Sequence, residues 1–283
     1  MDTLQDAQAL RRQLALWEVR DRTIGFVPTM GALHEGHLSL VRIARERAEK
    51  VVVSIFVNPA QFGPQEDFAR YPRQPEKDAE MLQPAGCDLL FLPEVDTIYP
   101  PGHTAIVEPG GPAEGLEGAL RPGHFRGVAT VVSALFNLVQ PDVAVFGKKD
   151  AQQVAVIQRM VRDLHFPVDV VAAETVREAD GLALSSRNAY LSQEERRAAP
   201  VLYKALRAAE QAITAGERRG DEVRRAMREV LESEPLARTE YAEVVDAESF
   251  QPVDALAGSL VLPLAVRIGG TRLIDNFQLV VGD

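Results

Sequence analysis

The sequence predicts an α/β protein built on a doubly wound parallel sheet, followed by a smaller α+β region. Short, β-branched apolar runs alternate with amphipathic helical patterns up to about residue 177, as in parallel strands joined by crossover helices. Beyond that point, charged helical patterns give way to strand-like segments. We therefore expect two domains, residues 1–177 and residues 178–283.

The first βαβ unit is expected within residues 24–57. Residues 24–30 and 51–57 are short and almost wholly apolar, as buried parallel strands are. Residues 38–50 between them place apolar side chains on one face of a helix, with arginines elsewhere. The alternation then continues. We expect strands at 89–93, 143–147 and 168–176, and helices at 128–140 and 151–164.

The C-terminal region is expected to begin with a long helix over 191–216. Ser192 and Glu195 form a capping-box pattern at its start, and Gly269–Gly270 marks a turn between two strand-like runs. A Gly/Pro-rich loop at 100–125 interrupts the first region, and loops of that length are often functional or mobile. We further expect a helix at 221–233 and strands at 241–245, 259–268 and 271–281.

Composition excludes several classes of protein. The formal net charge is −10, and no block of lysines and arginines suggests binding to nucleic acid or to a membrane surface. The single cysteine, Cys87, excludes an intramolecular disulfide and a multi-cysteine metal cluster. No run has signal-peptide or membrane-spanning quality. We expect a soluble, cytoplasmic protein.

A glycine- and histidine-rich segment, Gly31–His37, lies where the first predicted strand passes into a helix. Open α/β sheets bind ligands at this edge, and the free N–H groups of a helix N-terminus favour anions. Gly31 and Gly36 allow a ligand to approach the backbone, while His34 and His37 can donate to phosphate oxygens. A plain turn with two surface histidines is the alternative. A zinc pair is a further one, although catalytic zinc needs a third protein ligand.

Amide side chains follow the next predicted strand. Asn58 and Gln61 would open at the same edge of the sheet, where neutral amides suit a hydroxyl or a carboxylate. A Pro/Gly turn with solvated amides is the alternative interpretation.

A lysine-containing segment follows the strand predicted at 143–147. Lys148, Lys149 and Asp150 lie at a helix entrance, with Gln153 one turn further in. A lysine there suits a phosphate. Asp150 as a simple helix cap and Lys148 as a solvated side chain are the alternatives.

The segment 183–188 joins the two expected domains. Ser185, Ser186 and Arg187 concentrate hydroxyl and guanidinium donors there, a set suited to polyphosphate. The segment is placed to close over a bound nucleotide. Serine and asparagine also form ordinary loops, so this segment alone is weak evidence for a nucleotide site.

Five segments in order resemble the pantoate–β-alanine ligase (pantothenate synthetase) family: PTMGALHEGH, VNPAQFG, LRPGHFRGVATVV, FGKKDAQQ and LSSRNAYLS. The resemblance implies a Rossmann-like nucleotidyltransferase domain, a C-terminal lid domain and a homodimer. It implies that ATP and pantoate form pantoyl adenylate and pyrophosphate, and that β-alanine then displaces AMP to give pantothenate. Small molecules are the expected partners, with Mg²⁺ accompanying ATP as cosubstrate.

The resemblance also implies roles for individual residues. Catalysis would fall to His34, His37 and Lys149, with His37 as the candidate acid. Asp150 would lie near Mg²⁺, which should bridge phosphate oxygens and need few protein ligands. Pantoate contacts are implied for Asn58, Gln61 and Gln153. Nucleotide contacts are implied for Met30, Gly31, His34, Gly36, His37, Gly147, Lys149, Asp150, Val176, Leu184, Ser185, Ser186 and Arg187.

Three positions depart from the family pattern. Leu184 stands where methionine is common, Ala151 where an aromatic residue is common, and Lys148 where glutamate or glutamine is common. Ala151 is expected to loosen the packing behind Gln153, and Lys148 to add positive charge near phosphate. Arg121 and His124 match a family motif but receive no chemical step.

Two other functions remain open from the sequence. A nucleotidyltransferase acting on a phosphorylated small molecule would use the same histidine and serine–arginine elements, although Gln61 and Gln153 suit a hydroxylated acid better. A nucleotide- or zinc-binding module without turnover is the other alternative.

Overall fold

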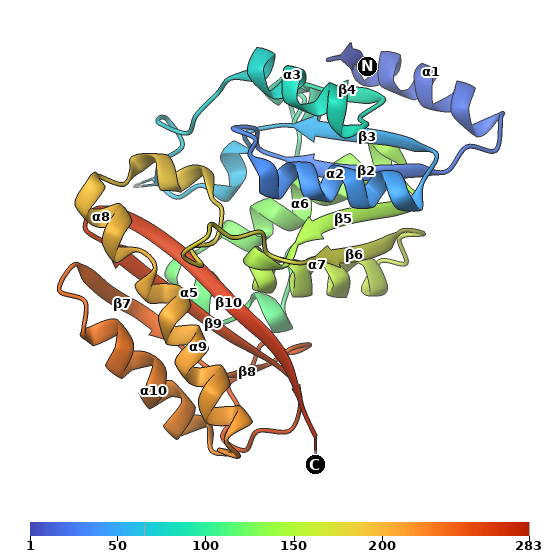
Figure 1. The fold of residues 1–283 in the computed structure, drawn as a ribbon. Coiled ribbons are helices and arrows are strands. Elements are labelled where there is room, and N and C mark those ends of the chain that lie inside the picture. Colours follow the sequence, from blue (N-terminus) through green and yellow to red (C-terminus); the bar gives the residue numbers. More distant parts are fainter. Residues whose placement is uncertain (65, 283) are drawn as a thin grey trace.

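The N-terminal part of the chain forms a six-stranded sheet (Figure 1). The computed structural model describes residues 1–64 and 66–282. Neighbouring strands run parallel in the order β1-β4-β3-β2-β5-β6. The strands are β1 (Asp2–Leu4), β2 (Ile24–Thr29), β3 (Lys50–Ile55), β4 (Leu89–Phe91), β5 (Val143–Gly147) and β6 (Asp169–Ala173). The predicted doubly wound parallel sheet is confirmed.

The strand order reverses between β2 and β5. From β2 the chain moves outward through β3 to β4, whereas β5 and β6 lie on the other side of β2. In open α/β sheets the crevice at the carboxyl ends of strands at such a reversal is the usual ligand site. The segments that follow β2 and β5 meet at this crevice, and they carry Gly31–His37 and Lys148–Gln153.

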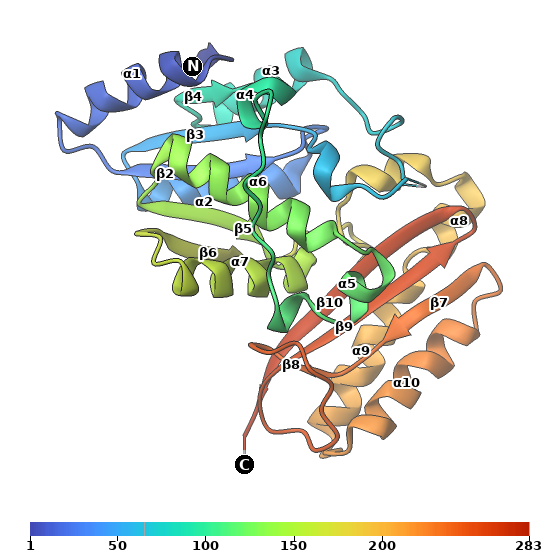
Figure 2. The same ribbon diagram turned by 180° about the vertical axis from the view of Figure 1, so that it is seen from behind.

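Helices cover both faces of the sheet. On one face α2 (Glu35–Arg47) and α3 (Pro75–Ala85) share an apolar cluster with β2, β3 and β4. On the other face α1 (Ala7–Glu18), α6 (His124–Val139) and α7 (Ala151–Asp163) share a second cluster. Figure 2 shows α6 lying across this face of the sheet. Among the described residues, no helix is both long enough and apolar enough to cross a bilayer.

β1, α1 and α3 were not among the predicted elements. β1 has only three residues and sits at the sheet edge beside β4, too short for a periodic signal. α3 includes Pro84 and has a mixed polar sequence. α1 buries Leu10, Leu14 and Trp17 at helical spacing, so its signal was present in the sequence.

The Gly/Pro-rich stretch at 100–125 contains short helices. They are η2 (Gly111–Ala113) and α5 (Leu116–Leu120), after α4 (Val95–Ile98). Gln152 on α7 fastens this stretch, because its Nε2 donates to the carbonyl of Pro112 at 2.9 Å and its Oε1 accepts the N–H of Glu117 at 3.1 Å. The stretch therefore packs against the helix that follows β5.

Residues after β6 build a separate antiparallel sheet, ordered β10-β9-β7 with β8 paired to β9. Helices α8 (Gln193–Ala198), α9 (Val201–Thr214) and α10 (Gly220–Glu232) lie against it in Figure 1 and contribute to its apolar cluster. The strands are β7 (Ala237–Ala242), β8 (Val245–Asp246), β9 (Gly258–Ile268) and β10 (Thr271–Val281). The predicted α+β region and its Gly269–Gly270 turn are confirmed, while the boundary after residue 177 stays a prediction.

The single long helix expected over 191–216 is wrong, because the structure has two helices there. The predicted capping box is present, with Ser192 Oγ accepting the N–H of Glu195 at 3.2 Å. α8 ends at Ala198 and α9 begins at Val201, with Pro200 between them. Proline has no N–H to donate and interrupts the helical ladder.

A buried carboxylate joins the Gly/Pro-rich stretch of the N-terminal part to the C-terminal sheet. Glu117 on α5 accepts the hydroxyl of Tyr241 at 2.8 Å and the guanidinium of Arg272 at 2.9 Å. Its side chain is 7% exposed. Burial alone would raise the pKa of Glu117, but the hydrogen bonds and charge of Arg272 outweigh burial and hold the pKa below its ordinary value.

Glu117→Gln is expected to lower the free energy of unfolding by about 3 kcal/mol, because removing one partner of a buried ion pair is strongly destabilising and leaves Arg272 with Glu240 alone. The pKa is depressed in the folded state, so this stabilisation is present at neutral pH and is lost as the pH falls through that lowered pKa. Glu248→Gln is the control. Its exposed pair with Arg162 also joins the two parts of the chain, at 2.6 Å, and should contribute less than about 1 kcal/mol. Denaturant unfolding of both variants measures the difference, and equal effects would contradict the assignment.

Candidate active site

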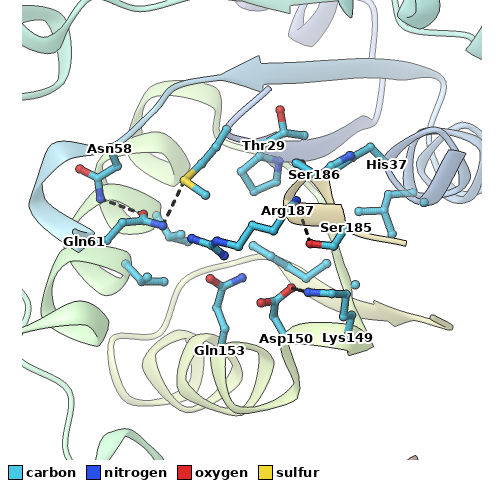
Figure 3. A pocket seen from close by; sticks show the side chains of 18 of the residues that line it. Thr29, His37, Asn58, Gln61, Lys149, Asp150, Gln153, Ser185, Ser186 and Arg187 are labelled. Carbon is cyan, nitrogen blue, oxygen red and sulfur yellow. Dashed lines mark hydrogen bonds and ion pairs between the residues drawn. The ribbon is translucent and has the colours of Figure 1, made fainter. Parts of the chain in front are cut away.

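A pocket opens at the carboxyl ends of β2 and β5 (Figure 3). It gathers side chains from segments that are far apart in the sequence. The predicted residues that line it are Met30, His34, Gly36, His37, Asn58, Gln61, Gly147, Lys149, Asp150, Gln153, Val176, Leu184, Ser185, Ser186 and Arg187. Of the predicted set, only Gly31 does not line it.

Gly31 shapes the turn between β2 and α2. Its φ is +82°, a left-handed conformation that glycine adopts freely. A Cβ at this position would lie 2.9 Å from Ile55 Cγ2, so a side chain has no room. A direct nucleotide contact of Gly31 stays a prediction.

Gly36 makes room for the ring of His34. α2 starts at Glu35, and His34 is its N-cap residue with extended backbone. A Cβ on Gly36 would lie 2.9 Å from His34 Cε1, which is closer than carbon atoms pack. His34 Nδ1 is buried with no hydrogen-bond partner among the described residues. A buried nitrogen left without a partner calls for an explanation, and a catalytic role is one.

His37 sits one turn into α2 with its ring beside that of His34, the ring centroids 4.1 Å apart. Its Nδ1 accepts the backbone N–H of His34 at 3.3 Å, which leaves the proton on Nε2. Burial, with the charges of His34 and Lys149, lowers the pKa of His37 to about 3. Burial and Lys149 lower the pKa of His34 to about 4, against the opposing charge of Asp150. Both rings are therefore neutral at pH 7.

Lys149 is positioned from both parts of the chain. Its side chain is 18% exposed, and its ion pair with Asp150 spans 3.8 Å. Asn276 on β10 donates to the backbone carbonyls of Lys148 and Lys149 at 2.8 Å and 2.9 Å. The C-terminal sheet thus fixes the backbone from which the Lys149 ammonium reaches the pocket.

Lys148 is turned to a different partner. Its ammonium pairs with Glu174, and it is not among the residues that line the pocket. The expectation that Lys148 adds charge near phosphate is not supported by this geometry, because a carboxylate neutralises it.

Asn58 is a buried positioning residue. Its Nδ2 donates to Gln61 Oε1 at 3.0 Å and to the carbonyl of Gly127 at 3.1 Å, while its Oδ1 accepts the Tyr99 hydroxyl at 2.8 Å. A Cβ on Gly127 would lie 2.3 Å from the carbonyl oxygen of Ala60, so α6 approaches this turn closely because residue 127 is glycine. With Asn58 engaged on both amide atoms, a direct substrate contact stays a prediction.

Two glutamines face the pocket from opposite walls (Figure 3). Gln61 Nε2 contacts Met30 Sδ at 3.2 Å, and Gln61 is 8% exposed. Gln153 comes from α7 beside Asp150. Behind it, Ala151 is buried in a cluster with Phe250 from the C-terminal part. The packing around Ala151 is thus completed by an aromatic side chain from elsewhere in the chain.

The segment 185–187 closes one side of the pocket. Arg187 forms a two-pronged ion pair with Asp67, at 3.1 Å and 3.0 Å. Burial would raise the pKa of Asp67, but the hydrogen bonds and charge of Arg187 hold it below its ordinary value. Ser186 Oγ donates to the carbonyl of Ala32 at 3.3 Å. The serine–arginine segment is therefore docked on the turn that precedes His34.

Arg121 and His124 support the turn that carries Gln61. His124 Nδ1 lies 2.9 Å from the carbonyl oxygen of Gln61, and Arg121 pairs with Glu66 at 2.7 Å. Burial and then the charge of Arg121 lower the pKa of His124 to about 4. Both residues line the pocket, and their contacts give them a positioning role that the sequence did not show.

The sequence also missed an apolar wall and an aromatic side chain. Val128, Val131, Val132 and Leu135 on α6 line the pocket, although their helical spacing alone indicated only a core-facing stripe. Tyr71 is a further lining residue and is buried. Its place in the loop after Gln61 was the available signal.

The zinc alternative finds no support in the arrangement of ligands. Across residues 1–64 and 66–282, no group of three or more histidine, cysteine, aspartate and glutamate side chains is placed to hold a metal ion. A catalytic zinc needs three protein ligands, and the two histidines supply at most two.

Comparisons with known proteins agree with the geometry. The profile of the Pantoate-beta-alanine ligase family matches residues 2–278. A pantothenate synthetase from Moorella thermoacetica is 54% identical over 283 residues, 100% of both chains. The pantothenate synthetase structure from Thermus thermophilus has a TM-score of 0.93 at 50% identity and covers 100% of each chain.

A more distant solved structure also matches over almost the whole length. The pantoate-β-alanine ligase from Francisella tularensis, complexed with beta-gamma ATP and β-alanine, has a TM-score of 0.79 at 34% identity, covering 98% of this chain and 97% of that chain. The profile and the full-length relatives together show that this chain belongs to the pantoate–β-alanine ligase family.

Proposed function

We propose that this pocket carries out both steps of an ATP-dependent condensation of pantoate with β-alanine. In the first step, a pantoate carboxylate oxygen attacks the α-phosphorus of ATP, giving pantoyl adenylate and pyrophosphate. In the second step, the β-alanine amine attacks the acyl carbon, loses a proton and displaces AMP. The observation that carries the proposal is one pocket in which His34, His37 and Lys149 face Gln61 and Gln153.

The histidines and the lysine serve the phosphates. Negative charge builds on the phosphate oxygens as pyrophosphate leaves, and fixed donors aimed at that charge stabilise the transition state. His37 supplies an Nε2–H because its Nδ1 is already an acceptor. Lys149 supplies a full positive charge. Neutral histidines beside one lysine give donors without repelling one another.

The glutamines and the apolar wall serve pantoate. Pantoate carries hydroxyl and carboxylate groups next to a carbon bearing two methyl groups. Neutral amides satisfy its polar groups without drawing a second polyphosphate into the same place. Val128, Val131 and Val132 offer an apolar surface for the methyl groups. We therefore place pantoate between Gln61 and α6.

We propose that Mg²⁺ accompanies ATP, with Asp150 as its protein ligand. The side chain of Asp150 is 48% exposed, and its ion pair with Lys149 spans 3.8 Å. Glu174, the other carboxylate that lines the pocket, pairs with Lys148. One carboxylate together with phosphate oxygens is a usual Mg²⁺ environment. When bound, the ion would shield the negative charge of the phosphates.

We propose a homodimer acting in the cytoplasm. The family resemblance supports the dimer, and the single thiol, Cys87, is buried and free, as suits a reducing compartment. Light scattering of the purified protein should give twice the mass of one chain. A mass equal to one chain would contradict the dimer.

A partial-reaction assay tests the function. The protein is incubated with ATP, Mg²⁺ and pantoate, with and without β-alanine, and pyrophosphate, AMP and pantothenate are followed separately. We expect pantoate-dependent exchange of pyrophosphate into ATP, with AMP and pantothenate formed only when β-alanine is present. Nucleotidyl transfer to a phosphorylated acceptor instead of pantoate would contradict the proposal and favour the transferase alternative.

Arg187→Ala is expected to raise the KM for ATP about 10- to 100-fold, because a charge-assisted hydrogen bond contributes about 1.5 to 3 kcal/mol. The guanidinium would exchange Asp67 for phosphate when nucleotide binds. Arg196→Ala is the control, since Arg196 pairs with Asp180 at 2.7 Å and does not line the pocket. Steady-state rates at saturating pantoate measure both, and an unchanged KM in Arg187→Ala would contradict the phosphate contact.

A further inference from the structure

Asp78 is a buried carboxylate that is not among the residues lining the pocket. It lies on α3 and is 1% exposed. Its Oδ2 accepts the N–H of Ala32 and its Oδ1 the N–H of Leu33, both at 2.9 Å. Gln74 donates to the same carboxylate at 3.3 Å. All of its recorded partners are hydrogen-bond donors, and among the described residues none of them is a lysine, an arginine or a histidine.

The backbone that Asp78 holds is strained. Gly31 and Ala32 have φ values of +82° and +51°, so two consecutive residues are left-handed, and alanine adopts this conformation reluctantly. A Cβ on Gly31 would lie 3.0 Å from Asp78 Oδ2, so the carboxylate fills the space beside the glycine. A conformation of this kind persists where surrounding contacts enforce it, and such strain gathers at functional sites.

The same turn is held from its other side by the 185–187 segment. Ser186 Oγ donates to the carbonyl of Ala32 at 3.3 Å, while Asp78 takes the N–H of that residue. Met30 immediately precedes the turn, His34 follows it after one intervening residue, Leu33, and both Met30 and His34 line the pocket. The direction in which His34 enters the pocket thus depends on a turn fixed between α3 and the 185–187 segment.

We propose that Asp78 is a positioning residue for the adenylation step: it enforces the left-handed turn at Gly31–Ala32 and thereby sets His34 and His37 in the pocket. This inference rests on the proposed roles of the two histidines. Asp78 itself touches no substrate. A purely structural carboxylate would stabilise the fold without altering where the imidazole rings lie.

Asp78→Asn provides the test, with Asp142→Asn as the control. Asp142 accepts the N–H of Ile24 at 2.7 Å, at the opposite end of β2 and away from the pocket. We expect Asp78→Asn to lower the kcat of pantoate-dependent pyrophosphate exchange about a hundredfold, as small misplacements of catalytic groups do. The KM for pantoate should change less than about threefold, because Gln61 and Gln153 are not moved. Asp142→Asn should exchange at the wild-type rate.

Imidazole resonances report positioning independently of activity. The chain has five histidines, so each ring is resolvable by nitrogen-labelled NMR. Asp78→Asn should shift the His34 and His37 signals and leave those of His103 and His165 in place.

Ala32→Gly added to Asp78→Asn removes the alanine strain and should recover activity at least about tenfold. If Asp78→Asn does not fold, the double variant is compared with Ala32→Gly alone, and any remaining loss of exchange and shift of the His34 and His37 signals report the contribution of Asp78.

The experiment distinguishes failure of the positioning role from failure of the proposed function. Unshifted His34 and His37 signals, or wild-type exchange in Asp78→Asn, would overturn the positioning role while leaving the proposed function intact. Equal losses in Asp78→Asn and Asp142→Asn would overturn it also, since stability alone would then explain the loss. Absence of pantoate-dependent exchange in the wild-type protein would instead refute the proposed function.

Discussion

Lys149→Ala is expected to slow pantoate-dependent pyrophosphate release about a thousandfold, the loss seen when a fixed group that stabilises developing charge is removed. The side chain is mostly shielded from solvent, and its ion pair with Asp150 is long, at 3.8 Å. Asn276 donates to the backbone carbonyl of Lys149 and to that of Lys148. The ammonium is thus placed beforehand and binds phosphate with little reorganisation. Rapid-mixing measurement of the first turnover isolates this step from the attack by β-alanine.

The adjacent lysine offers a matched control. Lys148 has the same charge and lies one residue away, but it pairs with Glu174 and is not among the residues lining the pocket. Lys148→Ala should therefore change the first-turnover rate by about twofold or less, as expected for removal of a pair whose glutamate is 84% exposed. If Lys149→Ala stays within tenfold of the wild type, or if Lys148→Ala is equally slow, the assignment of the phosphate-binding ammonium is wrong.

The parts of the fold that local pattern determines were predictable. β5 spans the predicted residues, and β9 and β10 agree with prediction to within one residue. β5 and β9 are largely apolar runs, β10 mixes apolar with polar residues, and turn residues bound them, which leaves little choice of structure. The break at Pro200 was also readable from the sequence, since proline lacks the N–H that a continuous helix requires. Short edge strands such as β1 carry too few residues for any period to show.

The sequence predicts which segments line the pocket. It does not predict the contacts that hold their side chains in place. Parallel strands bring their carboxyl ends to one edge, so His34, Gln61 and Lys149 could be expected together. The side chains that hold them come from long-range pairs. Asp67 lies 120 residues from Arg187, and no local pattern indicates which of many carboxylates a given arginine meets.

The same limit applies to backbone strain. Ala32 has a φ of +51°, although alanine is not a residue that signals a left-handed turn. The conformation follows from Asp78, whose partner is 46 residues away. Gly36 is the opposite case, because the reason for glycine is local. The ring of His34, two residues before it, occupies the space that a side chain at Gly36 would need.

His37→Ala is expected to lower the adenylation rate about 100- to 1,000-fold, the loss of one positioned donor. His37→Gln should recover at least about a tenth of the wild-type rate, because a neutral amide N–H can replace a neutral imidazole N–H. The structure motivates this order of activity, since Nδ1 accepts a backbone N–H and the donor is Nε2. His103→Gln, at an exposed ring, is the control. A glutamine variant as slow as alanine would favour the proton-donor role instead.

The change of kcat/KM with pH distinguishes a fixed neutral hydrogen-bond donor from a proton donor at His37. The pKa of His37 is lowered to about 3 and that of His34 to about 4, in each case chiefly by burial. Lowering the pH from about 8 to about 5 therefore leaves both rings neutral. Because kcat/KM for ATP reports the free protein and the free nucleotide, whose terminal phosphate ionises in this range, the wild type and His37→Gln should show the same profile, with no added histidine inflection near the ordinary value of about 6.5. A proton donor would require imidazolium, and kcat/KM would then rise as the pH falls. A profile shared by the wild type and an active His37→Gln variant leaves the fixed neutral donor as the explanation that accounts for both observations.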